Sequence, residues 1–545
     1  MKHIGELAEE LALSLLARGD EERERIADEE GFFSHIRRIR RWFRDMTGVD
    51  PREYERAGFF FETADSARGA GFRRENRIYR FTDGTTFPAD AYLPEREGKS
   101  PAILFLCGHA NEGRRFPDYV AAAQKFAANG FFVLIADPIG QGERAAPPYW
   151  QYSFRETDAI YAHAKLSRTA RAFGTAPCGI FYRDVLHQLR ALCGDSAADG
   201  SRVGVAGHSG GGMQTAMLML GGAPGVSAFS PSCYLTDMRS ILKNRVISDD
   251  EQIFRDMLKE GLDYCDMLLA AYPAKVLALG AKQDFFPIEG FRRSVSLAAE
   301  TAARGLGQNY IDSDIFDIGH RYDGQMSEAA LAFFRRALSA PRAPSRIDFL
   351  SESAAAEPRP TSAPCADFDP KKLKFFKGAG DKKILLFADS ARQSSERLAE
   401  LCKMGNLYLY PLGINALEED KTYDVGFDDA VFNSRAHADN LLALCGSSLA
   451  ASTVAEIRNA VEALLEQVDE VAADGLVELC LETALCEKKG VRAEYLGNVR
   501  AVLKKDVEGE KDLSRYAHSL VPGILERAAA CGLFGLGSQT GLPPT

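Results

Sequence analysis

Short apolar runs alternate with stretches of helical periodicity between Pro101 and about residue 338. Continuous apolar strands separated by helices are typical of a parallel sheet that is covered on both faces. The pattern therefore predicts an α/β fold with a mostly parallel sheet. The expected strands are Ala102–Cys107, Phe131–Ala136, Val203–Ala206, Val226–Phe229, Val276–Leu279 and Tyr310–Phe316. The expected helices are Tyr119–Ala128, Phe181–Leu192, Gly290–Arg304 and one near Glu328–Leu338.

The chain before this region has a different pattern. Apolar residues recur at helical spacing from Ile4 through Leu15, so residues 1–60 are expected to be helical. A hairpin is then predicted, with strands at Ile78–Phe81 and Phe87–Leu93 around an Asp-Gly turn. These patterns predict an N-terminal helical region over residues 1–75 and an α/β domain over residues 76–340.

The chain after residue 340 is expected to contain a linker and a second domain. Five prolines among Ser, Ala and Arg mark residues 341–380 as a Pro-rich linker. The alternation then resumes, which predicts a smaller α/β domain over residues 381–545. Its expected strands are Ile384–Ala388, Leu407–Tyr410 and a weak one at Val471, and its expected helices are Ser394–Met404, Ala436–Leu444 and Val454–Val468.

Composition and charge narrow the class of protein. The 545 residues are 46% hydrophobic and 26% charged, the balance of a soluble globular protein, and the formal net charge is −11. Nucleic-acid binding usually leaves a basic footprint, so an acidic chain argues against it. The one basic cluster is interleaved with apolar residues at helical spacing and is interpreted as the solvated face of a helix. It consists of Arg37, Arg38, Arg40, Arg41 and Arg44.

Cysteine usage and hydropathy indicate a cytoplasmic protein. The 11 cysteines include no C-x-x-C pair, and several lie in apolar runs, which favours buried thiols in a reducing compartment. Charges interrupt the N-terminal segment too often for a secretion signal. No stretch approaches the ~20 apolar residues of a membrane span. No membrane association is expected, and the oligomeric state stays open.

The strongest chemical signal is Gly207-His208-Ser209-Gly210-Gly211. It follows the expected strand Val203–Ala206 and precedes a helical run, Gly212–Leu220, which is the context of a nucleophile elbow. In such a turn, small neighbours let the serine hydroxyl stand above the sheet while the next backbone N–H points at a developing oxyanion. Ser209 is therefore the expected nucleophile, and an inert serine in a glycine-rich turn is the alternative.

The base and the acid follow from the chain order serine, acid, histidine. His320 follows the last expected strand of the first domain, while His437 and His518 lie in the second domain, so His320 is the expected base. Asp284 follows the strand Val276–Leu279 and is the expected acid. Asp317 is the serious rival, because Asp312 and Asp314 fall in or beside a strand.

The loop after the first long strand should supply a second oxyanion donor. Here that loop reads Cys107-Gly108-His109-Ala110-Asn111, so the backbone N–H groups of His109 and Gly210 are the expected pair. The His109 side chain has no matching ligand cluster in the sequence, and neither a metal nor a cofactor is expected. Tyr149 and Trp150 lie in a long excursion beyond Asp137–Arg144 and are candidates to stack on a sugar face. A packed surface loop is the alternative.

Residues of about 75 to 340 resemble the acetyl-xylan-esterase-like branch of the α/β-hydrolases. The resemblance implies a Ser–His–Asp esterase that acts through an acyl-enzyme, with the three roles falling on Ser209, His320 and Asp284. The region after residue 380 resembles a degenerate second α/β-hydrolase-like domain, since Val471–Gly475 lacks Ser and Cys where an elbow would stand. The matching stretches are Gly108-His109, Asp137–Arg144, Asp199–Arg202, Gly207–Gly212, Ser232–Tyr234 and Asp284–Gly290.

The expected function is thus a serine carboxylesterase that removes acetyl or other small acyl groups from a carbohydrate. The expected partner is a small-molecule or oligosaccharide ester. Two alternatives stay open: a peptidase or amidase on the same fold, which passes through the same tetrahedral intermediate, and a non-catalytic binding protein.

Overall fold

The computed structural model describes two compact units, and each is considered by itself. The larger unit comprises residues 15–167 and 175–359, and the smaller comprises residues 1–14, 168–174 and 360–545. The described residues are 4–145, 159–172, 176–246, 248–340, 370–379, 382–388, 402–403, 405–412, 434–447, 449–464 and 470–473.

The larger unit is built on a nine-stranded sheet with the strand order β1-β2-β3-β5-β4-β6-β7-β8-β9. The strands from β5 to β9 run parallel to one another, and β1, β2 and β3 join antiparallel at one side. The mostly parallel α/β sheet predicted from the sequence is therefore confirmed. The strands are β1 (Phe59–Gly69), β2 (Phe72–Phe81), β3 (Thr86–Pro94), β4 (Ser100–Leu106), β5 (Phe132–Ala136), β6 (Ala198–His208), β7 (Val226–Ser232), β8 (Lys275–Gln283) and β9 (Ile311–Gly319).

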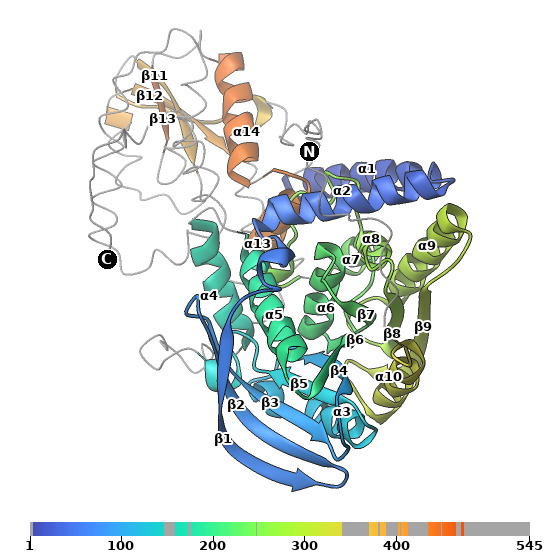
Figure 1. Cartoon of the computed structure of the whole chain (residues 1–545). Coiled ribbons are helices and arrows are strands. Elements are labelled where there is room, and N and C mark those ends of the chain that lie inside the picture. The colour runs from blue at the N-terminus through green and yellow to red at the C-terminus, as the bar shows by residue number, and fades with distance from the viewer. Residues whose placement is uncertain are drawn as a thin grey trace. The chain divides into compact units, whose positions relative to one another are not determined.

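Helices cover both faces of this sheet (Figure 1). One face carries α3 (Pro117–Ala128) and α10 (Gly324–Ala337), which pack on each other. The other face carries α5 (Pro177–Gly194), α6 (Gly210–Gly221) and α9 (Ile288–Leu306). The remaining helices are α1 (Ile4–Glu24), α2 (Glu29–Thr47), α4 (Ala159–Ala172), α7 (Met238–Asn244) and α8 (Tyr264–Ala270), with short 3₁₀ turns η1 (Pro51–Glu53), η2 (Gly113–Arg115), η3 (Gly142–Arg144) and η6 (Asp250–Gln252). None of the described helices combines the length and apolar composition needed to cross a membrane.

The central strands form because their residues are apolar on both faces. Every residue of β4, β5 and β7 is buried. The aromatic side chains of Phe105, Phe126 and Phe334 meet between the sheet and the α3–α10 layer. Burial on both faces removes the alternation of a half-exposed strand, which is why these runs are continuous in the sequence.

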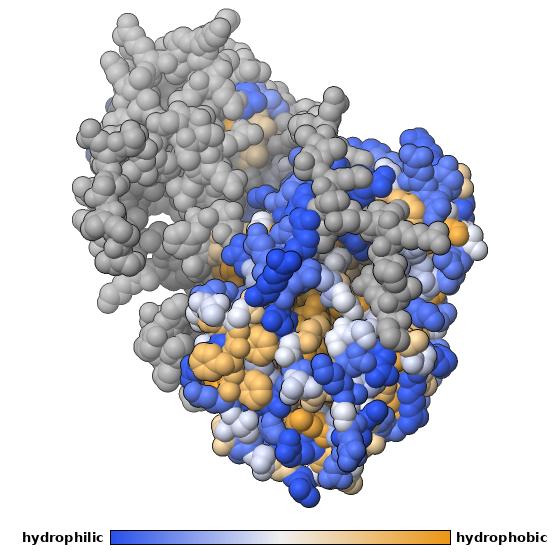
Figure 2. Space-filling view, viewed as in Figure 1, coloured by the Kyte–Doolittle hydropathy of each residue, from blue (hydrophilic) through white to orange (hydrophobic). Residues whose placement is uncertain are grey.

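The N-terminal helical region is shorter than the predicted 1–75. Strand β1 occupies residues from Phe59 to Gly69 and pairs with β2 at the edge of the sheet. Its residues are exposed or half-buried on both faces, including Phe60 and Phe61, so no buried face imposes a period of two on its sequence. Figure 2 shows hydrophobic residues gathered over the part of this edge where β1 begins.

Helix α2 adds a further layer over α5, α6, α8 and α9. Asp28 caps its start by accepting a hydrogen bond from the Gly31 N–H at 2.8 Å, and Gly48 ends it in the left-handed conformation at φ 65°. The interpretation of its arginines as a solvated face is wrong for Arg40. That side chain is buried and donates to the carbonyl oxygens of Ala270 and Tyr272 at 2.9 and 2.8 Å.

The smaller unit contains a four-stranded sheet with the order β10-β12-β11-β13. Strand β11 runs parallel to both neighbours, and β10 lies antiparallel at the edge. Strand β10 falls inside the predicted linker 341–380: it is only three residues long and exposed, so it leaves no apolar pattern. Most of the predicted helix Ser394–Met404 lies outside the described residues. The elements are η7 (Pro370–Lys372), β10 (Lys374–Phe376), β11 (Lys382–Ala388), β12 (Gly405–Pro411), α13 (Ser434–Leu444), α14 (Leu449–Leu464) and β13 (Glu470–Ala473).

A buried ion pair joins α1, α2 and α8 in the larger unit. Asp266 is 1% exposed and accepts from Arg23 Nη1 at 2.7 Å and from His35 Nε2 at 2.6 Å. Burial by itself would raise the pKa of Asp266, but Arg23 and His35 outweigh it and hold that pKa well below its usual range. The carboxylate is therefore charged at neutral pH and tightly held.

Replacing Asp266 with alanine should lower the free energy of unfolding by about 3–5 kcal/mol, since it removes the carboxylate that the buried Arg23 and His35 both contact. Arg23 keeps its ion pair with Asp20. Chemical denaturation followed by circular dichroism measures the change. Because the folded pKa lies below the unfolded one, the stabilisation is complete above about pH 5 and is lost as the pH falls further. Glu21→Ala is the control, since Glu21 pairs with Arg25 on the surface and should cost at most about 1 kcal/mol. Equal losses in the two variants would contradict the assignment.

Candidate active site

Ser209 stands at a sharp turn between β6 and α6. Its backbone has φ 56° and ψ −120°, a conformation that costs a non-glycine residue about 1–3 kcal/mol. Hydrogen bonds on both sides hold it there: its N–H donates to the Ser232 oxygen at 2.9 Å, and its own carbonyl accepts from Met213 N at 3.0 Å. The strand–turn–helix context that the sequence indicated is therefore present.

The glycines around Ser209 are required by close approach of backbone segments. A Cβ atom at Gly207 would lie 2.1 Å from the Gly211 oxygen, and one at Gly211 would lie 1.9 Å from the Leu106 oxygen. At Gly212 the distance to the Ser232 oxygen would be 2.7 Å. No side chain fits at these distances. The glycine pattern thus reflects how tightly α6 packs against the ends of β4 and β7.

Ser209, His320 and Asp284 form a hydrogen-bonded chain. His320 Nδ1 lies 2.8 Å from Asp284 Oδ1, and His320 Nε2 lies 2.8 Å from Ser209 Oγ. Because a carboxylate can only accept, Nδ1 carries the proton and Nε2 of the neutral ring is left to accept from the serine hydroxyl. The nucleophile, base and acid expected from the sequence therefore lie in the geometry that proton transfer from Ser209 needs.

The three hydrogen-bonded residues each lie just beyond the carboxyl end of a strand of the same sheet. Ser209 follows β6, Asp284 follows β8 and His320 follows β9. Asp284 is additionally fixed by the Phe286 N–H, which donates to its Oδ1 at 3.0 Å. Functional groups collect at this edge because the carboxyl ends of parallel strands meet there.

The rival acids lie elsewhere. Asp317 is 69% exposed and pairs with Lys282, with 3.6 Å between Nζ and Oδ2. Asp312 and Asp314 are exposed residues of β9. His437 lies on α13 in the smaller unit, and His518 lies outside the described residues.

Two rings flank the imidazole of His320. The Phe285 ring has its centroid 4.3 Å away and is 57% exposed, while the buried His208 ring lies 4.8 Å away. Burial, and then the proximity of His320, hold the pKa of His208 well below its ordinary value. His208 is therefore neutral and does not oppose a positive charge on His320.

The loop after β4 lies directly against Ser209. A Cβ at Gly108 would be 2.9 Å from Ser209 Cβ, and one at Gly210 would be 3.2 Å from the His109 ring. The Gly108 N–H donates to the Tyr119 hydroxyl at 3.1 Å, which fixes the start of the loop. The two residues expected to donate to an oxyanion, His109 and Gly210, are thus neighbours beside the nucleophile.

The loop from Asp137 to Arg144 supports this arrangement. Gln141 Oε1 accepts from the Ala110 N–H at 2.7 Å, and Asp137 Oδ1 accepts from the Arg114 N–H at 2.8 Å. Arg144 donates two hydrogen bonds to Asp184 of α5, each 2.8 Å long. The loop after β4 and the loop from Asp137 to Arg144 are therefore bound to each other, and the second loop is also bound to α5. Tyr149 and Trp150, the candidate sugar-stacking residues, lie outside the described residues.

Two residues near the site were missed by sequence reasoning. His163 of α4 and Glu251 of η6 meet the His109 side chain, so the expectation that His109 has no matching cluster is wrong. Burial opposes ionisation of Glu251, but His163 and His109 hold its pKa well below the usual range. The three residues are 54 and 88 positions apart along the chain, so no spacing rule joins them.

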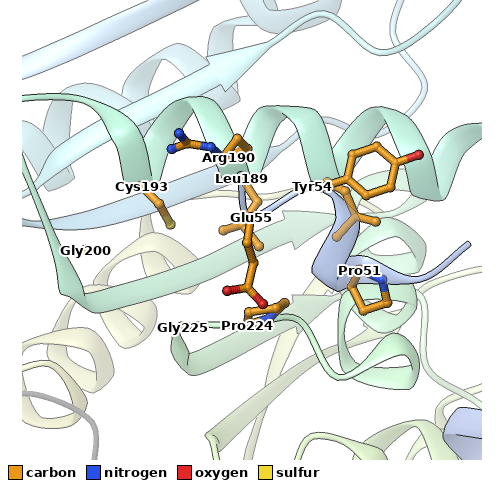
Figure 3. Close-up of a pocket in the computed structure, with 10 residues that line it drawn as sticks. Pro51, Tyr54, Glu55, Leu189, Arg190, Cys193, Gly200, Pro224 and Gly225 are labelled. Atoms are coloured by element: carbon orange, nitrogen blue, oxygen red, sulfur yellow. The ribbon is translucent and has the colours of Figure 1, made fainter. Parts of the chain in front are cut away.

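A separate pocket of about 290 Å³ lies away from the triad (Figure 3). It is at the amino ends of β6 and β7, whereas Ser209 follows the carboxyl end of β6. It therefore lies at the opposite end of β6 from Ser209. Its lining residues are Pro51, Tyr54, Glu55, Leu186, Leu189, Arg190, Cys193, Gly200, Pro224 and Gly225.

The elbow, the serine–acid–histidine order and the mostly parallel sheet define the larger unit as an α/β-hydrolase fold. No family model and no curated protein matches the chain.

Solved structures similar to this chain include three named esterases. The methylesterase BT1017 is 16% identical with a TM-score of 0.44, and the match covers 59% of this chain and 68% of that one. A glucuronoyl esterase from Solibacter usitatus is 15% identical with a TM-score of 0.36, over 51% and 86% of the two chains. Acetyl xylan esterase 1 from Thermoanaerobacterium sp. is 19% identical with a TM-score of 0.36, over 58% and 98%. Likeness at this level does not carry over an activity.

Gly211→Ala should lower the stability of the larger unit by about 3 kcal/mol or more, because the new methyl group overlaps the Leu106 oxygen. A thermal unfolding scan measures the change. Gly324→Ala is the matched control, since a Cβ there meets no atom within 4 Å, and its melting temperature should stay within about 2 °C of the wild type. A Gly211→Ala protein that melts like the control would show that the elbow packs less tightly than described.

Proposed function

We propose that the chain is a serine ester hydrolase that works through an acyl-enzyme. The observation that carries this proposal is the hydrogen-bonded chain from Ser209 through His320 to Asp284. A serine hydroxyl is a weak nucleophile until a neighbouring base takes its proton, and a base works only when a third group fixes its tautomer. Side chains of the larger unit supply the hydroxyl, the base and the group that fixes the tautomer of the base.

In the first half of the reaction, Ser209 Oγ attacks the ester carbonyl carbon while its proton moves to His320 Nε2. Asp284 keeps the other proton on Nδ1 and stabilises the imidazolium that results. The backbone N–H groups of Gly210 and His109 donate to the oxyanion of the tetrahedral intermediate. The C–O bond to the alcohol then breaks, and His320 gives its proton to the departing alkoxide.

In the second half, a water molecule attacks the acyl-enzyme and passes a proton to His320. The carboxylic acid leaves when the C–O bond to Ser209 breaks, and His320 returns the proton to Ser209 Oγ. The cycle consumes one ester and one water and releases one alcohol and one acid. No redox step occurs.

For the substrate, we propose a carbohydrate that carries acetyl or another small acyl group. The exposed Phe285 ring beside His320 offers a flat apolar surface next to the reacting atoms, and such a surface suits the face of a sugar. The sequence resemblance points to the same class. We further propose a cytoplasmic location, supported by the free thiols of the seven described cysteines. The region 381–545 is proposed to be non-catalytic, since it lacks an elbow serine or cysteine.

Ser209→Ala should reduce the hydrolysis of p-nitrophenyl acetate by about 10⁴-fold or more. Ser296→Ala is the matched control: Ser296 is exposed on α9 and donates to Glu300, so its activity should equal the wild type. An acetylated oligosaccharide and an acyl amide are tested in parallel. Hydrolysis of the amide alone would favour a peptidase or amidase, and full activity of Ser209→Ala would reject the triad.

Asp284→Asn should lower kcat by about 10⁴-fold, because an amide at this position favours the wrong tautomer of His320. Asp317→Asn is the matched comparison, since Asp317 is close in sequence to His320 but pairs with Lys282 on the surface. Its kcat should be unchanged. The reverse ranking of the two variants in a steady-state assay would transfer the acid role to Asp317.

A further inference from the structure

Three side chains meet at the loop after β4 and take no part in the proposed proton transfers. His109 Nε2 lies 2.8 Å from His163 Nδ1 and 3.0 Å from Glu251 Oε1, and the latter two atoms lie 3.3 Å apart. They come from the loop after β4, from α4 and from η6. Three ligating atoms thus form a nearly equilateral triangle.

The hydrogen bonds of His163 fix which of its nitrogens faces the others. His163 Nε2 lies 2.6 Å from the Ile139 carbonyl oxygen, which can only accept, so Nε2 carries the proton. In the neutral ring Nδ1 is then a bare lone pair. It faces Glu251 Oε1, which is also an acceptor, at 3.3 Å. The lone pairs of His163 Nδ1 and Glu251 Oε1 repel each other unless a proton donor or a cation lies between them.

The charge on Glu251 favours a cation over a shared proton alone. Glu251 is 1% exposed. Its Oε1 contacts the imidazoles of His109 and His163, and within the described part of the chain it forms no ion pair with a lysine or arginine. Its second oxygen, Oε2, is buried and has no hydrogen-bond partner among the described residues. A buried carboxylate with one unsatisfied oxygen is costly unless a positive charge compensates it.

The ligand types and distances fit a transition-metal ion. Two imidazole nitrogens and one carboxylate oxygen are a set that zinc takes when three protein ligands leave a fourth position open. A zinc ion at about 2.0–2.1 Å from each of three tetrahedral ligands separates them by about 3.3 Å, close to the separations of 2.8, 3.0 and 3.3 Å seen here. Histidine ligands of metals usually donate their other N–H to a carbonyl or carboxylate, as His163 does to Ile139.

We propose that His109, His163 and Glu251 bind a divalent transition-metal ion, with Zn²⁺ as the ion that their chemistry suits best. The His109 ring lies against Gly210, 3.2 Å from the position of a Cβ there. An ion that holds this ring therefore also holds the loop after β4 against the elbow. The role assigned to the ion is to position this loop, and the fourth coordination position can take a water or a substrate oxygen.

The test measures zinc binding by isothermal titration calorimetry and by elemental analysis, on tag-free protein that carries Ser209→Ala and has been treated with chelator. Because this background lacks the nucleophile, zinc binding is measured independently of the esterase proposal. One Zn²⁺ per chain is expected. His163→Ala and Glu251→Gln should each weaken binding by more than about 100-fold, since even changes to groups behind the ligands cost about 10–100-fold.

Two controls make the result specific. His187→Gln removes a histidine outside this group, which pairs with Asp83 at 2.8 Å, and should bind zinc like the parent. Cys233→Ser tests the second ligand group found among the described residues, His208, Cys233 and His320, and should also bind like the parent. Thermal scans with and without Zn²⁺ verify folding: the parent should gain stability with zinc, and Glu251→Gln should not.

Absence of stoichiometric zinc in the parent would overturn the proposal, as would unchanged affinity in folded Glu251→Gln. Loss of binding in Cys233→Ser with retention in His163→Ala would place the ion at the triad instead. If His163→Ala fails to fold, Glu251→Gln, which keeps the shape of the side chain, decides the outcome. Co²⁺ titration followed by visible absorption then reports the coordination number of the bound ion.

Discussion

The close approach of α6 to the ends of β4 and β7 is the constraint on which the site depends. The Leu106 oxygen and the Ser232 oxygen lie so near Gly211 and Gly212 that no side chain fits. This packing forces Ser209 into a positive φ, and the same contact brings the loop after β4 against the serine. The strain at Ser209 is therefore offset by the packing of α6 against the ends of β4 and β7, which fixes the position of the serine.

The packing around Ser209 also determines which charged and neutral groups surround His320. In the proposed mechanism the imidazole of His320 becomes positively charged, and two of its neighbours bear on this change. Asp284 holds one nitrogen, and His208 stays neutral because burial lowers its pKa. Phe285 adds a ring beside the base but leaves it partly open to solvent.

Much of the fold could be predicted from the sequence because burial leaves a pattern. Strands β4, β5 and β7 are buried along their whole length and appear as continuous apolar runs. Ser209 and Asp284 follow the largely buried strands β6 and β8, whereas His320 follows β9, an edge strand with several exposed residues. Strand β1 could not be predicted, because an exposed strand has no apolar period. The burial of Arg40 could not be predicted, since its contacts are with backbone oxygens that are distant in sequence. His163 and Glu251 were missed for the same reason: tertiary packing alone brings them to His109.

Strand β1 also bears on how the protein behaves in concentrated solution. It lies at the end of the sheet, and β2 is its one strand partner among the described residues, so one row of its backbone N–H and C=O groups faces away from the sheet. An open edge of this length is a template onto which another chain can add a strand. The exposed charges of Glu62, Asp65 and Arg68, together with the irregular register between Thr63 and Asp65, oppose such pairing. The colloidal stability of the chain therefore depends on a few surface charges that have no role in its chemistry.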